Sequence, residues 1–453
     1  MNENRHLQLL AEEKVPGALL KLGLPTMVGM MVSYLYNLVD TFFVGILGTS
    51  QQAAVSAVFP LSLIMLGIGL LFGTGAGSYL SRLLGEHKQK EADQCASTAL
   101  ITAVIVGGIT VVVMLAAIDP ILKTLGCTQT MMPYARAYGI PFVIALLFNV
   151  FNAVMSNIAT SEGASVFSMR SMLAGGISNM ILDPVFILLL HMGVTGAAAA
   201  TLIARLISFS TYVAYILKKR SCLDFSVKNF RPDKKVYGQI MKIGVPTMIY
   251  QFLCSTALAF MNFFAAAYGD AAVASIGIVT RICTLGVMTE MGFLKGYQPF
   301  VGYNFGAKRI RRVKEATKTA LIWTTVFSTL LFLIMVILRY QLVGIFSDDP
   351  QVIKIGAEAL LIGSISFPTM GFQLVWATRF IGLGKAKEGG LISLGRQGFF
   401  FIPVIFIFSR TFGLTGIICA QPCADMLSFV MVCVLAAGSR QTENRLIRAA
   451  DVI

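Results

Sequence analysis

The sequence predicts an all-α integral membrane protein. Twelve transmembrane helices are expected, in two six-helix lobes related by a pseudo-two-fold axis along the membrane normal. Three observations carry this prediction: an apolar composition, a series of long apolar runs, and an internal repeat. Of the 453 residues, 56% are hydrophobic and 13% are charged, whereas about 25% of a typical soluble domain is charged. Water is therefore not the main solvent of this chain.

Twelve apolar runs are long enough to cross a bilayer, since a spanning helix needs about 20 apolar residues. They cover residues 18–47, 53–80, 93–118, 132–157, 166–191, 194–217, 237–268, 272–303, 316–339, 352–381, 389–409 and 414–438. Glycine and proline inside these runs are tolerated because neighbouring helices satisfy the freed backbone groups. No small-residue cleavage site precedes the first run, so we expect it to remain in the protein as a helix.

The formal charge of +14 comes mainly from the loops between the runs. Lysine and arginine concentrate after the second, sixth and eighth runs, whereas the loops on the other side keep only Lys123, Arg339 and Arg410. By the positive-inside rule, the basic loops and both termini are cytoplasmic. We therefore expect a multi-pass protein of the plasma membrane, with no nucleic-acid partner.

An internal repeat divides the chain into two halves. KLGLPTM at Lys21–Met27 returns as KIGVPTM at Lys242–Met248, and GVTG at Gly193–Gly196 returns as GLTG at Gly413–Gly416. Because each half holds an even number of helices, both insert the same way up. We expect an N-terminal lobe over residues 1–217, a cytoplasmic linker over 218–235, a C-terminal lobe over 236–438 and a cytoplasmic tail over 439–453, with a binding cavity between the lobes.

Two acidic residues inside the runs are candidates for ion binding, since ionisable groups in a bilayer are costly. Asp40 follows Tyr36 by one helical turn, and Asp183 follows Asn179 by one turn, so each pair shares a helix face. Burial favours the neutral form of a carboxyl group, and these oxygens also suit a small hard cation. Proton and sodium both remain open. The plainer alternative is that the acids brace helices, although no basic residue lies within about one turn of either.

Further candidates lie elsewhere in the runs. Pro25 removes a backbone hydrogen bond and permits bending, but its repeat partner Pro246 suggests a packing role equally well. Glu290 is a third buried acid, which either forms an ion pair with Arg281 or Lys295 or provides a counter-charge for a cationic substrate.

Arg205 and Asp425 occupy equivalent repeat positions, which suggests an ion pair between the lobes or one that anchors a loop. Soft and aromatic side chains are expected near the cavity, where they would suit loosely specified apolar substrates. These are Phe260, Met261, Phe263, Phe264, Met288 and Met291. Ordinary packing is the alternative for this set.

Enzyme signatures such as HExxH, GxSxG and Walker A are absent from the sequence. The eight cysteines and three histidines show no metal-ligand spacing. We expect neither an enzyme nor a bound cofactor. No cytoplasmic segment is long enough for a nucleotide domain, so the energy for any active transport must come from an ion gradient.

The segments KGYQPFVGYNFGAKR at Lys295–Arg309 and LVDTFFVG at Leu38–Gly45 resemble the multidrug and toxic compound extrusion (MATE) family. The similarity extends over essentially the whole chain. The resemblance implies two six-helix lobes, a central cavity, and export of cationic or amphipathic compounds driven by inward proton or sodium flow. Site positions in one branch of the family match Asp40, Tyr36, Asn179, Asp183 and Thr201, and the helix 1 proline proposed to bend on protonation matches Pro25.

Another branch of that family has acidic ion-site residues in helices 7 and 10. Here helix 7 offers Asn262 and no carboxylate before Asp270, and helix 10 offers only Glu358. This departure favours an N-terminal site, with proton or sodium bound by Asp40, Asn179, Asp183 and Thr201. The expected substrate cavity is lined by Glu290, Met261, Phe264, Met288 and Met291.

We therefore expect an antiporter for small cationic or amphipathic molecules, for which a monomer is sufficient. Two alternatives remain open. One is a flippase for a lipid-linked or glycan precursor, which a cavity richer in arginine would favour. The other is an integral membrane enzyme with Asp40 or Glu290 as general base, but this would need a constellation of catalytic groups that His191 alone does not supply.

Overall fold

The computed structural model describes residues 3–450, and helices form almost all of that range. Among these residues, eleven helices are long and apolar enough to cross a membrane. Two further helices, α13 and α14, are bent by 49° relative to each other and make a twelfth span when they are taken together. The expected all-α membrane architecture is confirmed.

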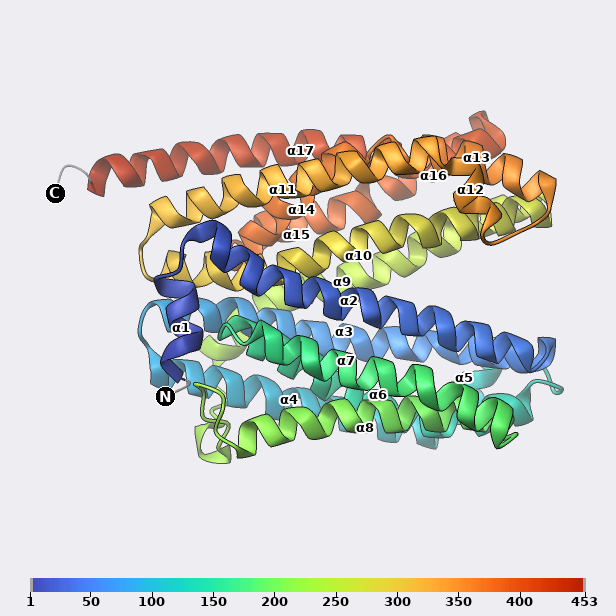
Figure 1. Ribbon diagram of the computed structural model, residues 1–453, viewed down its shortest axis with the longest axis horizontal. Coiled ribbons are helices and arrows are strands. Elements are labelled where there is room, and N and C mark those ends of the chain that lie inside the picture. The colour runs from blue at the N-terminus through green and yellow to red at the C-terminus, as the bar shows by residue number, and fades with distance from the viewer. Residues whose placement is uncertain (1–2, 451–453) are drawn as a thin grey trace.

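The first half of the chain forms the N-terminal lobe, α2 to α8, with α1 before it (Figure 1). Its elements are α1 (Glu3–Ala11), α2 (Val15–Ile46), α3 (Thr49–Gly85), α4 (Gln89–Ala116), α5 (Ile118–Thr124), α6 (Met132–Ser161), α7 (Ser165–Pro184), η1 (Val185–Leu189) and α8 (Gly193–Leu217). Pro184 ends α7, and a single π-helical turn, η1, follows it. Pro184 has no N–H to donate to the preceding turn, and the backbone changes to the π-helical pattern directly after it.

The second half forms the C-terminal lobe, α9 to α17. Its elements are η2 (Val227–Asn229) in the linker, then α9 (Lys234–Ala265), η3 (Ala266–Tyr268), α10 (Asp270–Gly306), α11 (Ile310–Ile337), α12 (Arg339–Gly344), α13 (Pro350–Ser364), α14 (Phe367–Gly382), α15 (Ala386–Leu394), η4 (Gly395–Phe399), α16 (Phe401–Thr411) and α17 (Gly413–Ala450). The expected tail therefore continues α17 as far as Ala450, and residues 451–453 lie outside the described range.

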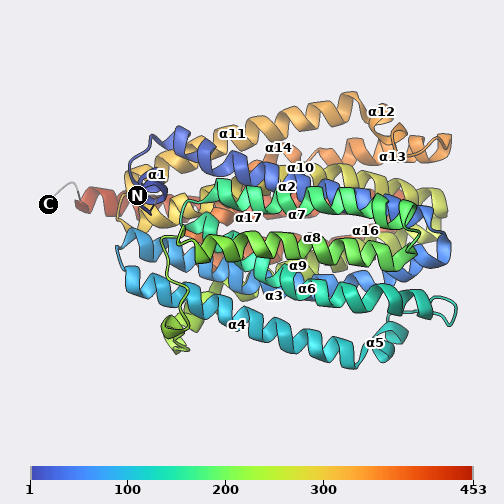
Figure 2. The same ribbon diagram turned by 60° about the horizontal axis from the view of Figure 1, so that its bottom comes forward.

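The repeat seen in the sequence is present in the backbone. The short helices α5 and α12 begin at equivalent positions of the repeat, Ile118 and Arg339, and they lie at the same end of the molecule (Figure 2). Positive φ angles also recur at equivalent positions, at Gly48 (121°) and Gly269 (90°), and at His87 (58°) and Lys308 (59°). Such angles are uncommon for residues other than glycine, so their recurrence shows that the two halves share one local geometry.

The two lobes pack through helix pairs that the pseudo-two-fold axis exchanges: α2 packs against α10, and α3 packs against α9. Equivalent glycines make both contacts close. A Cβ atom on Gly75 would meet the backbone of Ile240 on α9, and one on Gly296 would meet the backbone of Leu22 on α2. Gly75 and Gly296 occupy the same position in the two halves of the repeat. Small residues that let helix backbones approach closely are typical of membrane helix contacts.

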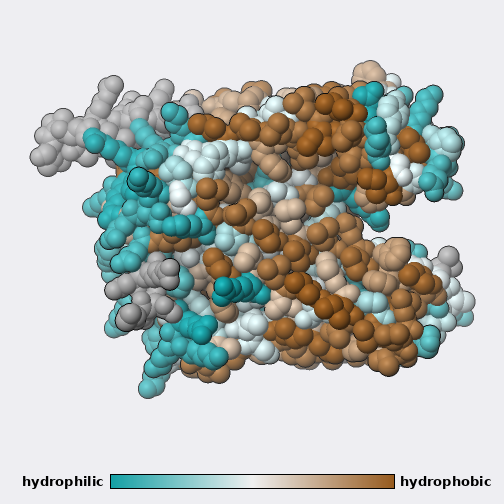
Figure 3. Space-filling view, in the orientation of Figure 1, coloured by the Kyte–Doolittle hydropathy of each residue, from teal (hydrophilic) through white to brown (hydrophobic). Residues whose placement is uncertain are grey.

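The lobes separate toward one end of the molecule. α1 and the last turns of α17 lie together at one end, the termini end (Figure 1). At the opposite end the space-filling view shows a notch between the lobes (Figure 3). Hydrophilic residues gather at the termini end, and an apolar surface covers much of the remaining length of the face shown (Figure 3). The glycine contacts therefore hold the lobes together on the termini side of an open cleft.

The linker between the lobes is attached to the N-terminal lobe. The buried carboxylate of Glu162, at the end of α6, accepts hydrogen bonds from Tyr215 Oη (2.6 Å), Ser221 Oγ (2.6 Å) and the Cys222 backbone N–H (3.0 Å). On α4, Ser97 Oγ donates to the carbonyl oxygen of Asp224 (3.0 Å). These bonds join the linker to two helices of the lobe that precedes it.

Candidate functional site

The predicted N-terminal site lies within one lobe, toward the opposite end from the termini. α2 positions Tyr36 and Asp40 one turn apart, and α7 positions Asn179 and Asp183 one turn apart. The amide Nδ2 of Asn179 donates to Asp183 Oδ1 at 3.2 Å. Asn179 and Asp183 are buried, with 2% and 0% of their surfaces exposed. The carboxyl groups of Asp40 and Asp183 are close enough to interact electrostatically.

A basic group, Arg205 on α8, reaches this site. Its Nη2 donates to the hydroxyl of Tyr36, and its guanidinium carbon lies 5.2 Å from the centroid of the Tyr36 ring. The charge of Arg205 also interacts with Asp40. The sequence places no base within about one turn of either acid, but α8 supplies one from a different helix. One positive charge therefore lies close to Asp40 and contacts the Tyr36 ring.

The expected pairing of Arg205 with Asp425 is wrong. Asp425 instead accepts a hydrogen bond from Arg396 Nε at 2.7 Å, within the C-terminal lobe. Ser366 Oγ (2.8 Å) and Gln421 Nε2 (2.9 Å) also donate to its carboxylate. Equivalent positions of a repeat lie at equivalent places in two different lobes. Each residue is therefore packed inside its own lobe, and the two need not meet.

Three buried acceptor oxygens in the site have no hydrogen-bond donor among the described residues: Asp40 Oδ1, Asn179 Oδ1 and Asp183 Oδ2. A buried acceptor without a partner costs roughly 1–3 kcal/mol. A proton would turn one carboxylate oxygen into a donor, and a small hard cation would satisfy several oxygens together. The residues present therefore fit either ion. Within the described part of the chain, no group of three or more His, Cys, Asp or Glu forms a metal site.

The structure adds one residue to the predicted site, Tyr138, and shows no bond from another, Thr201, to the acids. Thr201 lies half-buried on α8, one turn before Arg205, and in the described structure its hydroxyl makes no hydrogen bond to either acid. Tyr138 on α6 was not predicted. It is 3% exposed and lies in the neighbourhood of Asp40, Asp183 and Arg205. The sequence offers only two signals that could have identified Tyr138: it lies in an apolar run, and another tyrosine, Tyr134, precedes it by one turn.

Glu290 occupies a separate place in the C-terminal lobe. It is 2% exposed and accepts a hydrogen bond from Ser328 Oγ. Of the two alternatives for Glu290, the ion pair with Arg281 or Lys295 is not formed. Lys295 Nζ donates across the lobes to Ser156 Oγ at 2.7 Å, while Arg281 is exposed. One carboxylate oxygen, Glu290 Oε2, has no hydrogen-bond donor within the described residues.

The predicted apolar residues of the cavity lie on α9 and α10. Met261 and Phe264 pack in a core of the C-terminal lobe with Phe401 and Ile405 of α16. Met288 and Met291 are half-buried and flank Glu290 on α10. Pro25 lies inside α2, nearer the termini end than Asp40. A substrate role for the four apolar residues, and a switch role for Pro25, stay predictions.

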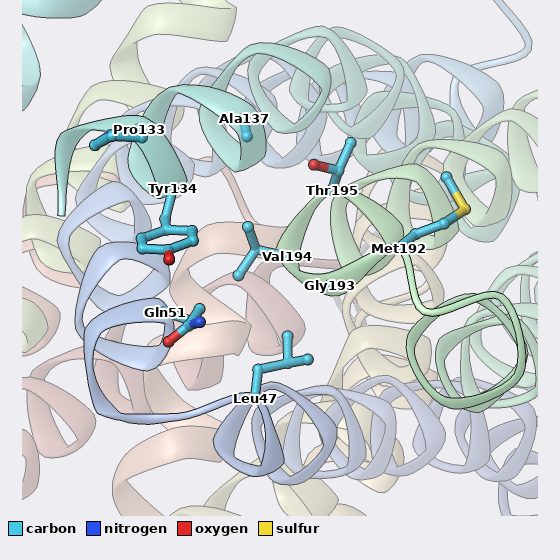
Figure 4. A pocket seen from close by; sticks show the side chains of 9 residues that line it. All are labelled: Leu47, Gln51, Pro133, Tyr134, Ala137, Met192, Gly193, Val194 and Thr195. Atoms are coloured by element: carbon cyan, nitrogen blue, oxygen red, sulfur yellow. The ribbon is translucent and has the colours of Figure 1, made fainter. Parts of the chain in front are cut away.

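A pocket of about 350 Å³ opens in the N-terminal lobe at the opposite end from the termini. Figure 4 shows its lining, which comes from the end of α2, the start of α3 and the starts of α6 and α8. The lining residues are Leu47, Gln51, Pro133, Tyr134, Ala137, Met192, Gly193, Val194 and Thr195. None of them is charged.

Comparisons with known proteins agree with this architecture. A family model described as MatE matches residues 25–185 and 246–407, one stretch in each half. Multidrug export protein MepA of Staphylococcus aureus (strain MSSA476) is 30% identical over 433 residues, covering 95% of this chain and 94% of that protein. The Staphylococcus saprophyticus protein of the same name is 28% identical over 436 residues, covering 96% of this chain and 95% of that protein.

Solved structures show the same fold. An outward-facing multidrug resistance MATE family transporter of the MOP superfamily aligns with a TM-score of 0.91 at 25% identity, covering 97% of this chain and 98% of that one. A MOP superfamily transporter from Pyrococcus furiosus aligns with a TM-score of 0.91 at 25% identity, covering 97% of this chain and 99% of that one.

Proposed function

The chain belongs to the MATE family of membrane transporters, and we propose that it exports cationic or amphipathic compounds in exchange for an inward-moving proton or sodium ion. Its relatives named multidrug export proteins support drug efflux as the direction and purpose of transport. It is a transporter rather than an enzyme. Coupling to an ion is argued from the residues of the N-terminal lobe.

The observation that carries the proposal is the set of buried acceptors at Asp40, Asn179 and Asp183 without donors. Two carboxylates in electrostatic contact repel each other while both are ionised, and binding one proton or sodium ion relieves that repulsion. The bound ion would also satisfy acceptors that otherwise remain unpaired. The site is therefore suited to bind and release one small cation during each transport cycle.

Antiport requires that ion and substrate stabilise different states of the protein. We propose that substrate occupies the cleft between the lobes, which opens at the end opposite the termini (Figure 3). Ion binding at Asp40 would reshape α2, which contains Pro25 and packs against α10 of the other lobe. Bending of α2 at Pro25 is the proposed link from ion to cleft. The termini end, with its basic loops, is the proposed cytoplasmic side of the plasma membrane, and one chain contains both lobes.

A flippase for a lipid-linked precursor is not favoured by any specific observation. Such a protein would gather arginines to hold an anionic headgroup. Here Arg136 pairs with Asp119 at 2.6 Å on the surface, Arg396 pairs with Asp425, and Arg205 contacts Tyr36. These three arginines lie in separate regions, each with a partner.

The first test is efflux of a fluorescent lipophilic cation from proteoliposomes, with a pH gradient and a sodium gradient imposed separately. Asp40→Asn and Asp183→Asn keep the shape of each side chain but remove its charge. We expect one of the two gradients to drive efflux by the wild type, and each substitution to lower the rate about tenfold or more.

Asp348→Asn, which changes an exposed loop aspartate, is the matched control and should transport like the wild type. If both site variants retain gradient-driven efflux at the wild-type rate, these aspartates do not couple transport to an ion and the proposed mechanism is wrong. Efflux by the wild type that neither gradient accelerates would contradict ion coupling itself.

A further inference from the structure

The pocket in the N-terminal lobe and the acidic site share their walls. Three of the helices that line the pocket each carry a site residue deeper on the same face. On α2, Asp40 lies seven residues before Leu47, and on α8, Thr201 lies seven residues after Val194. Seven residues make almost two full turns of an α-helix, so both members of each pair point the same way about 10 Å apart.

On the third helix, α6, only one turn separates the pocket residue from the site residue. Tyr134 lines the pocket near the start of α6 (Figure 4). Tyr138 follows one turn deeper on the same face, in the neighbourhood of Asp40 and Asp183. All three helices run so that the pocket residue is nearer the opposite end and the site residue is nearer the middle of the lobe. The pocket therefore lies between the acids and the end of the lobe that faces away from the termini.

We propose that this pocket is the entrance through which the coupling cation, a proton or a sodium ion, reaches Asp40 and Asp183 from outside the cell. The inference rests on the proposed ion-coupled function and adds to it a route. The ion enters within the N-terminal lobe, whereas substrate leaves through the cleft between the lobes. Ion and substrate thus use separate openings on the same side of the membrane.

Size and chemistry both suit a small hydrated ion. A volume of about 350 Å³ holds about ten water molecules at roughly 30 Å³ each. It is at the small end of the range for pockets that enclose drug-sized ligands, about 300–1,000 Å³. Gln51, Tyr134 and Thr195 supply oxygen atoms to the lining.

No positive charge in the lining repels a cation. The nearest arginine along α6, Arg136, has its charge balanced by Asp119 at 2.6 Å. Deeper in the lobe, three acceptors have no hydrogen-bond donor in the described part of the chain: Asp40 Oδ1, Asn179 Oδ1 and Asp183 Oδ2. A cation would bind more favourably at these oxygens than in the uncharged pocket. A pocket with uncharged walls next to an acidic site would not hold the ion at its mouth by a charged binding group.

The test is to block the pocket on folded protein. Ala137→Cys is purified, treated with a bulky methanethiosulfonate reagent and reconstituted, and modification at position 137 is measured by mass spectrometry. Gradient-driven efflux is compared with that of the same preparation before treatment. Two controls receive the same treatment: Ile140→Cys, an exposed position one turn further along α6, and the wild type, which reports on the eight native cysteines.

We expect modified Ala137→Cys to export about tenfold more slowly, with an unchanged dissociation constant for the fluorescent cation. Both treated controls should keep their rates. Ala137→Trp, which fills the pocket without a reagent, should show the same slowing. Unimpaired efflux by fully modified Ala137→Cys or by folded Ala137→Trp would overturn the route, as would a thiol at position 137 that the reagent cannot reach.

Asp40→Asn is measured in the same series to separate the two proposals. If efflux is lost in Asp40→Asn but survives a blocked pocket, ion coupling stands and only the route is wrong. If neither gradient drives efflux by the wild type at all, the proposed function is wrong, and the route for a coupling ion is wrong with it. A blocked pocket that weakens binding of the fluorescent cation would show that substrate uses the pocket, which would also overturn the proposal.

Discussion

Two ion pairs of the molecule differ sharply in how much water reaches them. The side chains of Arg396 and Asp425 are 9% and 1% exposed, whereas those of Arg136 and Asp119 are 54% and 41% exposed. Removing one partner of a buried pair leaves an unpaired charge away from water, but an exposed charge is simply hydrated. The same chemical change therefore has different consequences at the two sites.

Asp425→Ala should destabilise the protein by about 3–5 kcal/mol, because it leaves the Arg396 guanidinium buried without its carboxylate. Asp119→Ala should cost less than about 1 kcal/mol. Thermal unfolding of both variants in detergent measures the difference. Equal melting temperatures for the two variants would show that the buried pair has no special role in stability. The double variant Arg396→Met/Asp425→Leu, which removes both charges, should recover much of the loss.

At the scale of helices, stability depends on how closely α3 and α9, and α2 and α10, approach. The neighbours of Gly75 and Gly296 are backbone atoms, which cannot turn aside as a flexible side chain can. An added methyl group must therefore push the two helices apart.

Gly75→Ala and Gly296→Ala are each expected to lower stability by about 1–3 kcal/mol, despite the better helix propensity of alanine. Gly108→Ala on α4 is the matched control, since a Cβ there meets nothing within 4 Å. That control should be neutral or slightly stabilising. The fraction of monodisperse protein after heating, followed by size-exclusion chromatography, reports the outcome. Wild-type behaviour of Gly75→Ala and Gly296→Ala would mean that the lobes are not in close contact there.

The repeat also supplies a matched pair of prolines, Pro25 in α2 and Pro246 in α9. Pro246 packs close to Gly390, whose added Cβ would lie 3.1 Å from the proline ring. We expect Pro25→Ala to restore a backbone hydrogen bond, stiffen α2 and slow gradient-driven efflux about tenfold. Pro246→Ala should alter stability more than the transport rate. Equal transport rates in the two variants would remove Pro25 from the proposed coupling between ion and cleft.

At the scale of the whole molecule, the termini end is closed by contacts that cross between the lobes. The end of α1 and the turn after it lead into the N-terminal lobe, but three of their carbonyl oxygens accept hydrogen bonds from side chains of the C-terminal lobe. Arg309 Nη1 donates to Ala11 O (2.6 Å), Arg312 Nη2 to Glu13 O (2.7 Å) and Asn304 Nδ2 to Leu10 O (3.1 Å). A state that opens at the termini end must break these bonds.

The double variant Arg309→Ala/Arg312→Ala should shift the protein toward that state, since hydrogen bonds from charged donors contribute about 1.5–3 kcal/mol each. Hydrogen–deuterium exchange should rise near the ends of α10 and α1. Lys318→Ala, an exposed position on the same helix α11, is the control. Exchange that rises equally in both variants, or in neither, would contradict a role for the α1 contacts in closing this end.

Much of this architecture follows from the sequence, because membrane helices are decided locally. A segment of about 20 apolar residues must satisfy its own backbone groups in lipid, so hydropathy alone places the spans. The repeat then predicts two lobes and the axis between them. One-turn spacing on a single helix likewise places Tyr36 beside Asp40 and Asn179 beside Asp183.

What the sequence could not determine is how side chains of different helices meet. Arg205 on α8 contacts Tyr36 and lies near Asp40, and Tyr138 on α6 lies near both acids, because of how the helices of one lobe pack. The same packing, and not the repeat, pairs Asp425 with Arg396. Contacts between residues far apart in the sequence also decide which acceptors remain unpaired and at which end the cleft and the pocket open. The sequence by itself therefore determined the spans, the repeat and the face of each acid, and only the tertiary structure decided which groups share a site.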